Sequence, residues 1–247
     1  MNGHTGRRRV ALVTGASTGL GETLAEFLAG QGWAVVLTAR TAADLDVVAE
    51  RLRGRGAEVV ALPGDVGDHG HRERLAAAAA GLGGLDWLVN NASVMGVSPI
   101  RPLLDHPLDS FDLVLRTNVT APVALAQLAM PLLVESGGLV VNLSSEAAVE
   151  VFPCAGVYGA SKAALDQASR IMAAEIADSG AGVVFVDPGG IRTRGYEQAE
   201  PGFDLSGVPY PDVTLPFWTW LLDRKAVEVN GCRYLAQQLG WTVAEAV

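Results

Sequence analysis

The sequence predicts an α/β protein built on a single Rossmann-type, doubly wound parallel sheet of about seven strands with helices on both faces. Short apolar runs typical of strands alternate along the chain with longer segments of helical periodicity. The short runs are largely continuous in apolar residues, as expected of parallel strands that are covered on both faces. A glycine-rich turn joins the first strand to the first helix, which is typical of nucleotide-binding sheets.

The alternation predicts the elements in chain order. We expect strands at Val10 to Val13, Ala34 to Thr38, Glu58 to Leu62, Asp86 to Val89, Leu139 to Leu143 and Val183 to Val186. We expect helices at Leu20 to Gly30, Ala42 to Arg53 and His71 to Leu82, one from Pro107 to Leu133 that bends near Pro122 and ends near Pro131, and one that begins near Tyr158. The Gly- and Pro-rich segment at about 189–216 is expected to form a loop over the site.

Composition limits the class of protein. No linker or charge block divides the 247 residues, so we expect one domain over 1–247. A net charge of -9 argues against nucleic acid or an anionic membrane as the partner. The two cysteines lack metal-ligand spacing, so we expect no metal site and a reducing, cytoplasmic location. No apolar stretch is long enough to predict a bilayer span, and we assign no chemistry to His4, His69, His71 and His106, which lie in polar or loop-like contexts.

Tyr158 and Lys162 are four residues apart and are predicted to share one face at the start of a helix. Ser145 lies thirteen residues before the tyrosine, just after a predicted strand, so the three side chains can converge on one substrate oxygen. A nearby ammonium favours the phenolate and lowers the tyrosine pKa from about 10, which suits a general acid/base. Taken alone, this spacing is more often found on an ordinary surface helix.

The turn from Thr14 to Gly21, TGASTGLG, is predicted to hold the pyrophosphate of a dinucleotide. Its glycines permit a tight turn and a close approach, and the helix N-terminus favours negative charge. The spacing G-x-x-x-G-x-G differs from the commoner G-x-G-x-x-G. Ala39 and Arg40 follow the second strand, where an arginine suits a 2′-phosphate and favours NADP over NAD, unless Arg40 only caps a helix or faces solvent. Asp65 could accept from the adenine amino group or cap the next segment.

Together these motifs resemble those of the short-chain dehydrogenase/reductase family in its compact form. The resemblance covers nearly the whole chain and rests on five motifs in the family's order. TGASTGLG is similar to the cofactor turn, Asn90-Asn91-Ala92-Ser93 to the NNAG motif, Asn118 to the helix asparagine, Ser145 with Tyr158 and Lys162 to the active site, and Pro188-Gly189 with Ile191 and Thr193 to the nicotinamide contact. The resemblance implies hydride transfer between the nicotinamide of a bound cofactor and a carbonyl or alcohol carbon of a small molecule, and Arg40 favours NADP(H) as that cofactor.

The resemblance also implies a role for each site residue. Tyr158 protonates the developing alkoxide, Ser145 holds the substrate oxygen, and Lys162 binds the nicotinamide ribose while lowering the tyrosine pKa. Asn118 holds a water that links Lys162 to solvent, and a helix kink or a main-chain tie there is compatible with this role. The implied cofactor-binding residues are Gly15, Ser17, Thr18, Gly19, Leu20, Gly21, Arg40, Asp65, Val66, Asn91, Ala92, Ser93, Tyr158, Lys162, Pro188, Gly189, Ile191 and Thr193.

Three departures from the family pattern bear on these roles. Ser93 replaces the usual glycine of NNAG and puts a hydroxyl near the cofactor or substrate. Thr18 stands where some NADP-preferring relatives carry a basic residue, so phosphate recognition rests mainly on Arg40. The C-terminal end lacks the glycine pair on which many relatives finish, which leaves the last strand and its contacts uncertain.

Apolar and aromatic residues are expected to line the substrate pocket, which favours a hydrophobic or aromatic ketone. They are Val94 to Ser98, Glu146 to Phe152, Cys154, Tyr196, Phe203, Phe217, Trp218 and Trp220. The group Phe217, Trp218 and Trp220 is equally compatible with ordinary core on a short helix. Glu146 either contacts a polar substrate group or faces solvent.

The predicted function is that of an NADPH-dependent ketoreductase. The resemblance argues against enoyl reduction as an alternative, because related enzymes of that type have a longer spacing between the tyrosine and the lysine than this chain. An NADP-binding regulator without turnover is weakened because all four catalytic residues are present. Small and apolar residues on several faces of the long helices favour a homodimer or homotetramer. The natural substrate and the physiological direction stay open.

Overall fold

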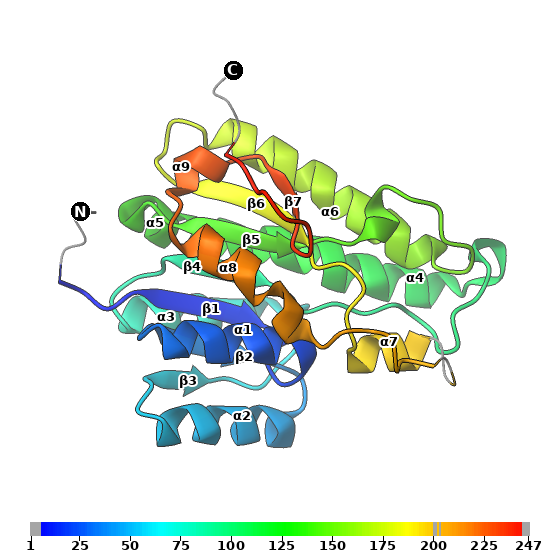
Figure 1. Ribbon diagram of the computed structural model, residues 1–247, viewed down its shortest axis with the longest axis horizontal. Helices are drawn as coiled ribbons and strands as arrows, with labels where there is room; N and C mark the ends of the chain where they lie inside the picture. Colours follow the sequence, from blue (N-terminus) through cyan, green and yellow to red (C-terminus); the bar gives the residue numbers. More distant parts are fainter. Residues whose placement is uncertain (1–5, 200–201, 203, 244–247) are drawn as a thin grey trace.

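The structure, a computed structural model, describes residues 6–199, 202 and 204–243, so His4 and Phe203 lie outside the described residues. Seven parallel strands form one sheet in the order β3-β2-β1-β4-β5-β6-β7 (Figure 1). They are β1 Val10–Thr14, β2 Ala34–Thr38, β3 Val59–Ala61, β4 Trp87–Asn90, β5 Leu139–Leu143, β6 Gly182–Asp187 and β7 Arg233–Leu235. The predicted fold class is confirmed, and the uncertain last strand is β7, which pairs with β6.

Helices follow the strands, and most predicted helices are present with ends shifted by a few residues. The helices are α1 Gly19–Gly30, α2 Ala42–Gly54, α3 His69–Gly81, α4 Leu108–Leu115, α5 Ala121–Ser136, α6 Gly156–Glu175, α7 Arg194–Ala199, α8 Leu215–Leu222 and α9 Ala226–Val229. Shorter helical turns are η1 Leu103–Asp105, η2 Arg116–Thr120, η3 Glu146–Ala148 and η4 Pro211–Thr214. The segment expected to be a loop at 189–216 therefore contains α7 and η4.

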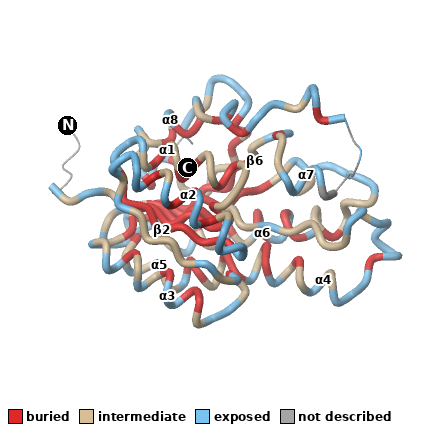
Figure 2. The backbone as a smooth tube through the Cα atoms, turned by 90° about the horizontal axis from the view of Figure 1, so that it is seen from below, coloured by how far each residue is buried: buried red, intermediate tan, exposed pale blue. Residues whose placement is uncertain are grey.

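Two apolar cores lie on the two faces of the sheet, because alternate strand residues point to opposite faces. Leu12 and Val140 pack with α3, α5 and α6, whereas Val13 and Val141 pack with α1, α2 and α8. Figure 2 shows the buried strands at the centre, between helices whose outer faces are exposed. The strand order reverses between β1 and β4, so a ligand is expected beyond the carboxyl ends of these strands.

The long helix predicted from Pro107 to Leu133 differs from the structure in two ways. Its irregular part is a π-helical turn, η2, in which the N–H of Ala121 bonds to the carbonyl of Arg116. Pro122 has no N–H, so it cannot donate to the carbonyl of Asn118 four residues earlier. The predicted end near Pro131 is wrong, since α5 continues to Ser136 with its apolar face buried on the sheet.

The continuous helical stretch Leu108–Ser136 is by length and composition long and apolar enough to cross a membrane. Its most apolar window has a mean hydropathy of 1.4, and 44% of that window is buried inside the fold. A core helix has the same composition, so the stretch is weak evidence for a membrane span.

His71 does not lie in the polar or loop-like context that the sequence suggested. It lies in α3, is 1% exposed, and its Nε2 is 2.8 Å from Oγ1 of Thr38 in β2. The contact is therefore structural, because it joins α3 to β2 of the sheet.

Candidate active site

Ser145, Tyr158 and Lys162 come together at the carboxyl edge of the sheet. Ser145 follows β5 and caps η3, where its Oγ accepts a hydrogen bond of 3.2 Å from the N–H of Ala147. Tyr158 and Lys162 lie one turn apart at the start of α6. The Tyr158 hydroxyl is hydrogen-bonded to the side chains of Ser145 and Ser93. The structure therefore has the geometry expected from the spacing of the three residues, and it adds Ser93 as a second hydroxyl partner.

The pKa of Tyr158 runs opposite to the prediction. Burial is the main cause of a rise in this pKa to about 12, to which the negative charge of Asp187 also contributes, while the hydrogen bonds from Ser145 and Ser93 act to lower it. The expected lowering by Lys162 is not found, and the Lys162 Nζ lies 5.4 Å from the centroid of the tyrosine ring. In this structure Tyr158 is therefore a protonated phenol at neutral pH, which makes it a proton donor.

Lys162 is almost fully enclosed, with 2% of its surface exposed. Its Nζ donates a hydrogen bond of 2.7 Å to the main-chain carbonyl of Leu143 at the end of β5. Burial lowers the pKa of Lys162 to about 8, and the carboxylates of Asp166 and Asp187 oppose that change. A lysine held this way can change its charge near neutral pH.

Asn118 lies in the π-helical turn and ties three segments together. Its Oδ1 accepts from the N–H of Val94 and its Nδ2 donates to the Val94 carbonyl, both at 2.9 Å. The same Nδ2 donates to Oγ of Ser161 at 3.0 Å, and Ser161 donates to the carbonyl of Tyr158 at 2.7 Å. The side chain is therefore the main-chain tie that the sequence left open, and it connects the segment after β4 to the first turn of α6.

The turn between β1 and α1 has the shape of an anion cradle. Gly15 and Gly19 have positive φ values of 65° and 60°, which glycine adopts without strain. The Thr18 side chain makes no capping hydrogen bond, so it does not satisfy the N–H groups at the start of α1. Such an N-terminus suits the pyrophosphate of a dinucleotide, so the residues present fit that group.

Asn91 holds the cradle against the sheet. Its Nδ2 donates to the carbonyls of Thr14 at 2.9 Å and Gly15 at 3.1 Å. The hydroxyl of Thr14 in turn accepts from the N–H groups of Asn91 and Ala92, each at 3.0 Å. The predicted residues Asn91 and Ala92 therefore fix the start of the glycine turn through hydrogen bonds to Thr14 and Gly15.

Gly21 is expected to tolerate no side chain. A Cβ there would overlap the carbonyl oxygen of Gly15 and the side-chain amide of Asn91. We expect Gly21→Ala to destabilise the protein by about 1–3 kcal/mol and to weaken dinucleotide binding, as measured by urea unfolding and by cofactor titration.

Gly30→Ala is the matched control for Gly21→Ala, because Gly30 ends the same helix and no atom lies within 4 Å of a Cβ built on it. Equal stability of the two variants would contradict the steric argument.

Arg40, which is predicted to lie near the adenosine of a bound dinucleotide, is exposed just beyond β2. Asp65 accepts a hydrogen bond of 2.7 Å from the N–H of Gly67 and so closes a turn, whereas the cap of the next helix, α3, is Asp68. The carbonyl of Val66 accepts a bond of 2.7 Å from Arg72. Arg194 of α7, which the sequence did not indicate, pairs at 3.0 Å with Asp44 in the first turn of α2. A second guanidinium thus reaches the helix that follows Arg40.

The segment from Pro188 to Thr193 lies against the glycine turn. Gln237, after β7, donates to the carbonyls of Pro188 at 2.9 Å and Gly190 at 3.0 Å. A Cβ built on Gly19 would lie 3.2 Å from Cγ2 of Thr193, and Ile191 is buried. A cleft of about 300 Å³ beside Gly19 and Thr193 is lined also by Arg192 and residues of α1, α7 and η4.

Three aromatic residues of the predicted pocket, Phe217, Trp218 and Trp220, belong to the core or pack against it. Phe217 and Trp218 are 0% exposed, and both pack on the face of the sheet that α1 and α2 cover. Trp220 packs beside Tyr234, with ring centroids 5.2 Å apart. Glu146 is exposed, which supports the solvent-facing alternative. The apolar residues that remain near Ser145 and Tyr158 come from the segments after β4 and β5.

Comparisons with known proteins give the same fold. A family model described as short chain dehydrogenase matches residues 9–202. The chain is 38% identical over 188 residues to dehydrogenase/reductase SDR family member 4 of Bos taurus, which covers 75% of this chain and 66% of that protein. It therefore spans slightly less than two thirds of that relative's length.

Solved structures extend the similarity to most of the chain. A short chain dehydrogenase from Pseudomonas syringae has a TM-score of 0.87 and 30% identity, over 94% of this chain and 95% of that one. A short chain dehydrogenase from Shigella flexneri, solved in complex with NADP, has a TM-score of 0.86 and 28% identity, over 94% of this chain and 98% of that one.

Proposed function

The chain belongs to the short chain dehydrogenase family of oxidoreductases, and on that premise we propose that it is an NADPH-dependent ketoreductase acting on a small apolar carbonyl compound. The observation that carries the proposal is the pair of serine hydroxyls, from Ser145 and Ser93, bonded to a Tyr158 phenol beside buried Lys162. The cofactor complex of the Shigella flexneri relative supports the choice of NADP.

The proposed mechanism assigns a role to each group at the site. NADPH, when bound, would supply the hydride, and the residues that would hold it are the 15–21 turn, Arg40, the 91–93 segment and the 188–193 segment. Ser145 would bind the substrate oxygen, and Tyr158 would donate its proton from Oη to that oxygen as it gains negative charge. Because its pKa is about 12, Tyr158 carries this proton throughout the neutral range.

The proposed substrate is apolar, without a special preference for aromatic rings. Val151 and Phe152, in the segment that follows Ser145, are exposed, and Val94 and Met95 after β4 are half-buried. These side chains would contact the body of a ketone whose oxygen lies at Tyr158. Burial of Phe217 and Trp218 in the core removes the strongest argument for an aromatic substrate.

The test of the function is consumption of NADPH and NADH by the purified protein with aliphatic, aromatic and polycyclic ketones. We expect reduction of at least one apolar ketone, with NADPH preferred. Mass spectrometry identifies the product. Reduction of a carbon–carbon double bond beside an untouched ketone would replace the proposal with enoyl reduction. Tight NADPH binding with no turnover on any carbonyl would favour a regulatory protein.

Arg40 is proposed to recognise the 2′-phosphate. An Arg40→Ser variant is expected to lose about ten- to a hundredfold in its preference for NADPH over NADH, because it loses one charge-assisted hydrogen bond. The measurement is the ratio of kcat/KM for the two cofactors.

Arg55→Ser is the matched control for Arg40→Ser, since Arg55 is an exposed arginine at the far end of α2. If Arg40→Ser leaves the ratio of kcat/KM for the two cofactors unchanged, another cation must recognise the 2′-phosphate. Arg194 would be tested next.

The proposed active form is a homodimer or homotetramer. Apolar side chains are exposed at the start of α4, on α5 and on α6, at Leu108, Val134 and Ile171. A second copy of the chain that packed against these helices would cover such side chains, as is common in symmetric oligomers.

A further inference from the structure

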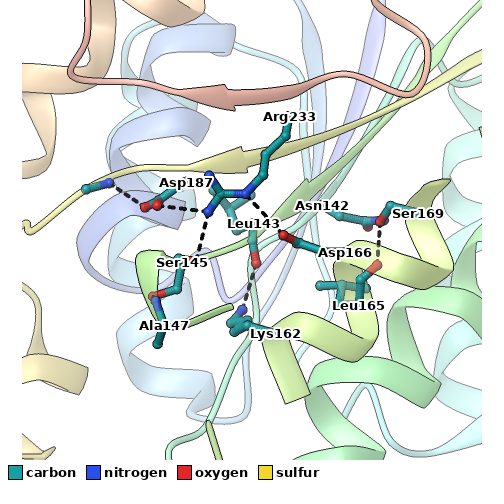
Figure 3. A network of polar contacts seen from close by, with 11 residues as sticks. Asn142, Leu143, Ser145, Ala147, Lys162, Leu165, Asp166, Ser169, Asp187 and Arg233 are labelled. Carbon is teal, nitrogen blue, oxygen red and sulfur yellow. Dashed lines mark hydrogen bonds and ion pairs between the residues drawn. The ribbon is translucent and has the colours of Figure 1, made fainter. Parts of the chain in front are cut away.

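One arginine connects three segments beneath the active site. Arg233, in β7, donates from Nε to Oδ2 of Asp166 and from Nη2 to Oδ2 of Asp187, both at 3.1 Å. The same Nη2 donates to the main-chain carbonyl of Ser145 at 3.0 Å (Figure 3). These three acceptors belong to α6, to the end of β6 and to the segment after β5. One guanidinium therefore fixes the relative positions of these segments.

The two carboxylates depend on this arginine for compensation. Their side chains are 3% and 4% exposed, and that of Arg233 is 18% exposed. Oδ1 of Asp187 accepts from the N–H of Gly189 at 2.9 Å, whereas Oδ1 of Asp166 has no hydrogen-bond partner among the described residues. A buried carboxylate is strongly unfavourable without an opposite charge, and removal of the guanidinium would take away the ion-pair partner of both groups.

The same charges act on the candidate catalytic pair. Asp187 raises the pKa of Tyr158, and Asp166 and Asp187 both raise the pKa of Lys162. The charged groups around the pair thus come from α6, β6 and β7. Because the guanidinium lies between the carboxylates, it offsets their effect on the tyrosine and the lysine.

We propose that Arg233 is a positioning residue of the active site, which holds the Ser145 carbonyl in place and neutralises Asp166 and Asp187 beside the Tyr158–Lys162 pair. The proposal rests on the oxidoreductase function proposed above and adds a residue to it from the last strand. A lysine cannot replace this arginine, because three bonds from Nε and Nη2 require a planar fork.

The test compares Arg233→Met with the parent protein through two readouts. The first is the titration of Lys162, followed by NMR on protein labelled with ¹³C at the lysine Cε. The chain has two lysines, and Lys225→Met assigns the signals. We expect the Lys162 pKa in Arg233→Met to rise by about one pH unit or more, because the carboxylates lose their counter-charge. Because burial lowers this pKa, a loosened fold would raise it too. The variant described below that also removes both carboxylates separates the two causes, since loosening would raise its Lys162 pKa and loss of the carboxylates would lower it.

The second readout is ketone reduction. In Arg233→Met we expect kcat to fall by about ten- to a hundredfold, because the serine is displaced, with the KM for NADPH unchanged. Arg233→Lys should keep the Lys162 pKa near that of the parent, because it keeps the positive charge. Its kcat should fall, because an ammonium lacks the planar guanidinium that makes the three hydrogen bonds. Arg170→Met, an exposed arginine of α6, is the control expected to change neither readout.

A third variant keeps the test decisive if Arg233→Met does not fold. The combination of Arg233→Met with Asp166→Asn and Asp187→Asn removes all three charges. Its Lys162 pKa should fall below that of the parent, while kcat stays low because the Ser145 carbonyl still lacks its donor.

An unchanged Lys162 titration and an unchanged kcat, in whichever of these variants folds, would overturn the proposal. If the parent reduces no carbonyl at all, the proposed function fails, and the Lys162 titration still decides the role of Arg233.

Discussion

A Tyr158→Phe variant is expected to lose carbonyl reduction by about a hundred- to ten-thousandfold, which is the usual contribution of a positioned general acid. The phenylalanine ring fills the same space but has no proton to donate and no hydroxyl for Ser145 and Ser93. NADPH binding should be preserved, because the glycine turn and its Asn91 tie are unaffected. The measurements are kcat by NADPH consumption and the cofactor Kd by fluorescence titration.

Tyr234→Phe is the control for this experiment. Tyr234 is also largely buried, and its hydroxyl donates to the carbonyl of Thr242 at 3.1 Å. Its ring packs in the aromatic cluster with Phe217, on the opposite face of β7 from the Arg233 side chain. It should keep its turnover. A Tyr158→Phe variant that retained more than about a tenth of the parent rate would exclude the phenol as the proton donor.

Lys162→Met is expected to abolish turnover and at the same time to stabilise the protein. Burial lowers the pKa of Lys162 to about 8 from 10.5, so below pH 8 the fold carries a buried charge that costs on the order of 3 kcal/mol. Methionine removes that cost and loses the bond to the Leu143 carbonyl, worth about 1 kcal/mol. Urea unfolding at pH 7 should therefore show a gain of about 2 kcal/mol.

The stability gained by Lys162→Met is expected to decrease as the pH rises. As pH rises from about 8 to 10.5, the folded parent protein loses the lysine proton before the unfolded chain does, so the parent becomes relatively more stable. The advantage of Lys162→Met should shrink over that range. Lys225→Met, at an exposed lysine, should be neutral within about 0.5 kcal/mol. A Lys162→Met protein less stable than the parent at pH 7 would show that the ammonium is compensated in the fold.

Most of the sheet could be predicted because its signals are local. A parallel strand covered on both faces is apolar at each position, and each run ends at glycine or polar residues, so the sequence alone located six strands. β7 was not located, because it has three residues and one of them is Arg233. A charged residue in so short a strand is recognised only through Asp166 and Asp187, which are distant in the sequence.

The candidate catalytic residues could be located by their spacing in the sequence, but their pKa values could not be predicted from it. The pKa of Tyr158 depends on burial and on Asp187, which becomes its neighbour only when β6 pairs with β5. The extension of α5 past Pro131 depends on burial of the helix against the sheet. The burial of Phe217 and Trp218 could not be distinguished from a pocket lining, because both are apolar aromatic surfaces in the sequence.

Synthesis of the chain from its N-terminus gives the last strand a separate importance. Asp166 and Asp187 precede Arg233 by 67 and 46 residues. A chain that ends before Arg233 contains both carboxylates but not their guanidinium, and in it β6 would be an open sheet edge. Arrival of β7 closes that edge and neutralises the carboxylates in one event. The final strand thus supplies both the outer partner of β6 and the counter-charge of the two carboxylates.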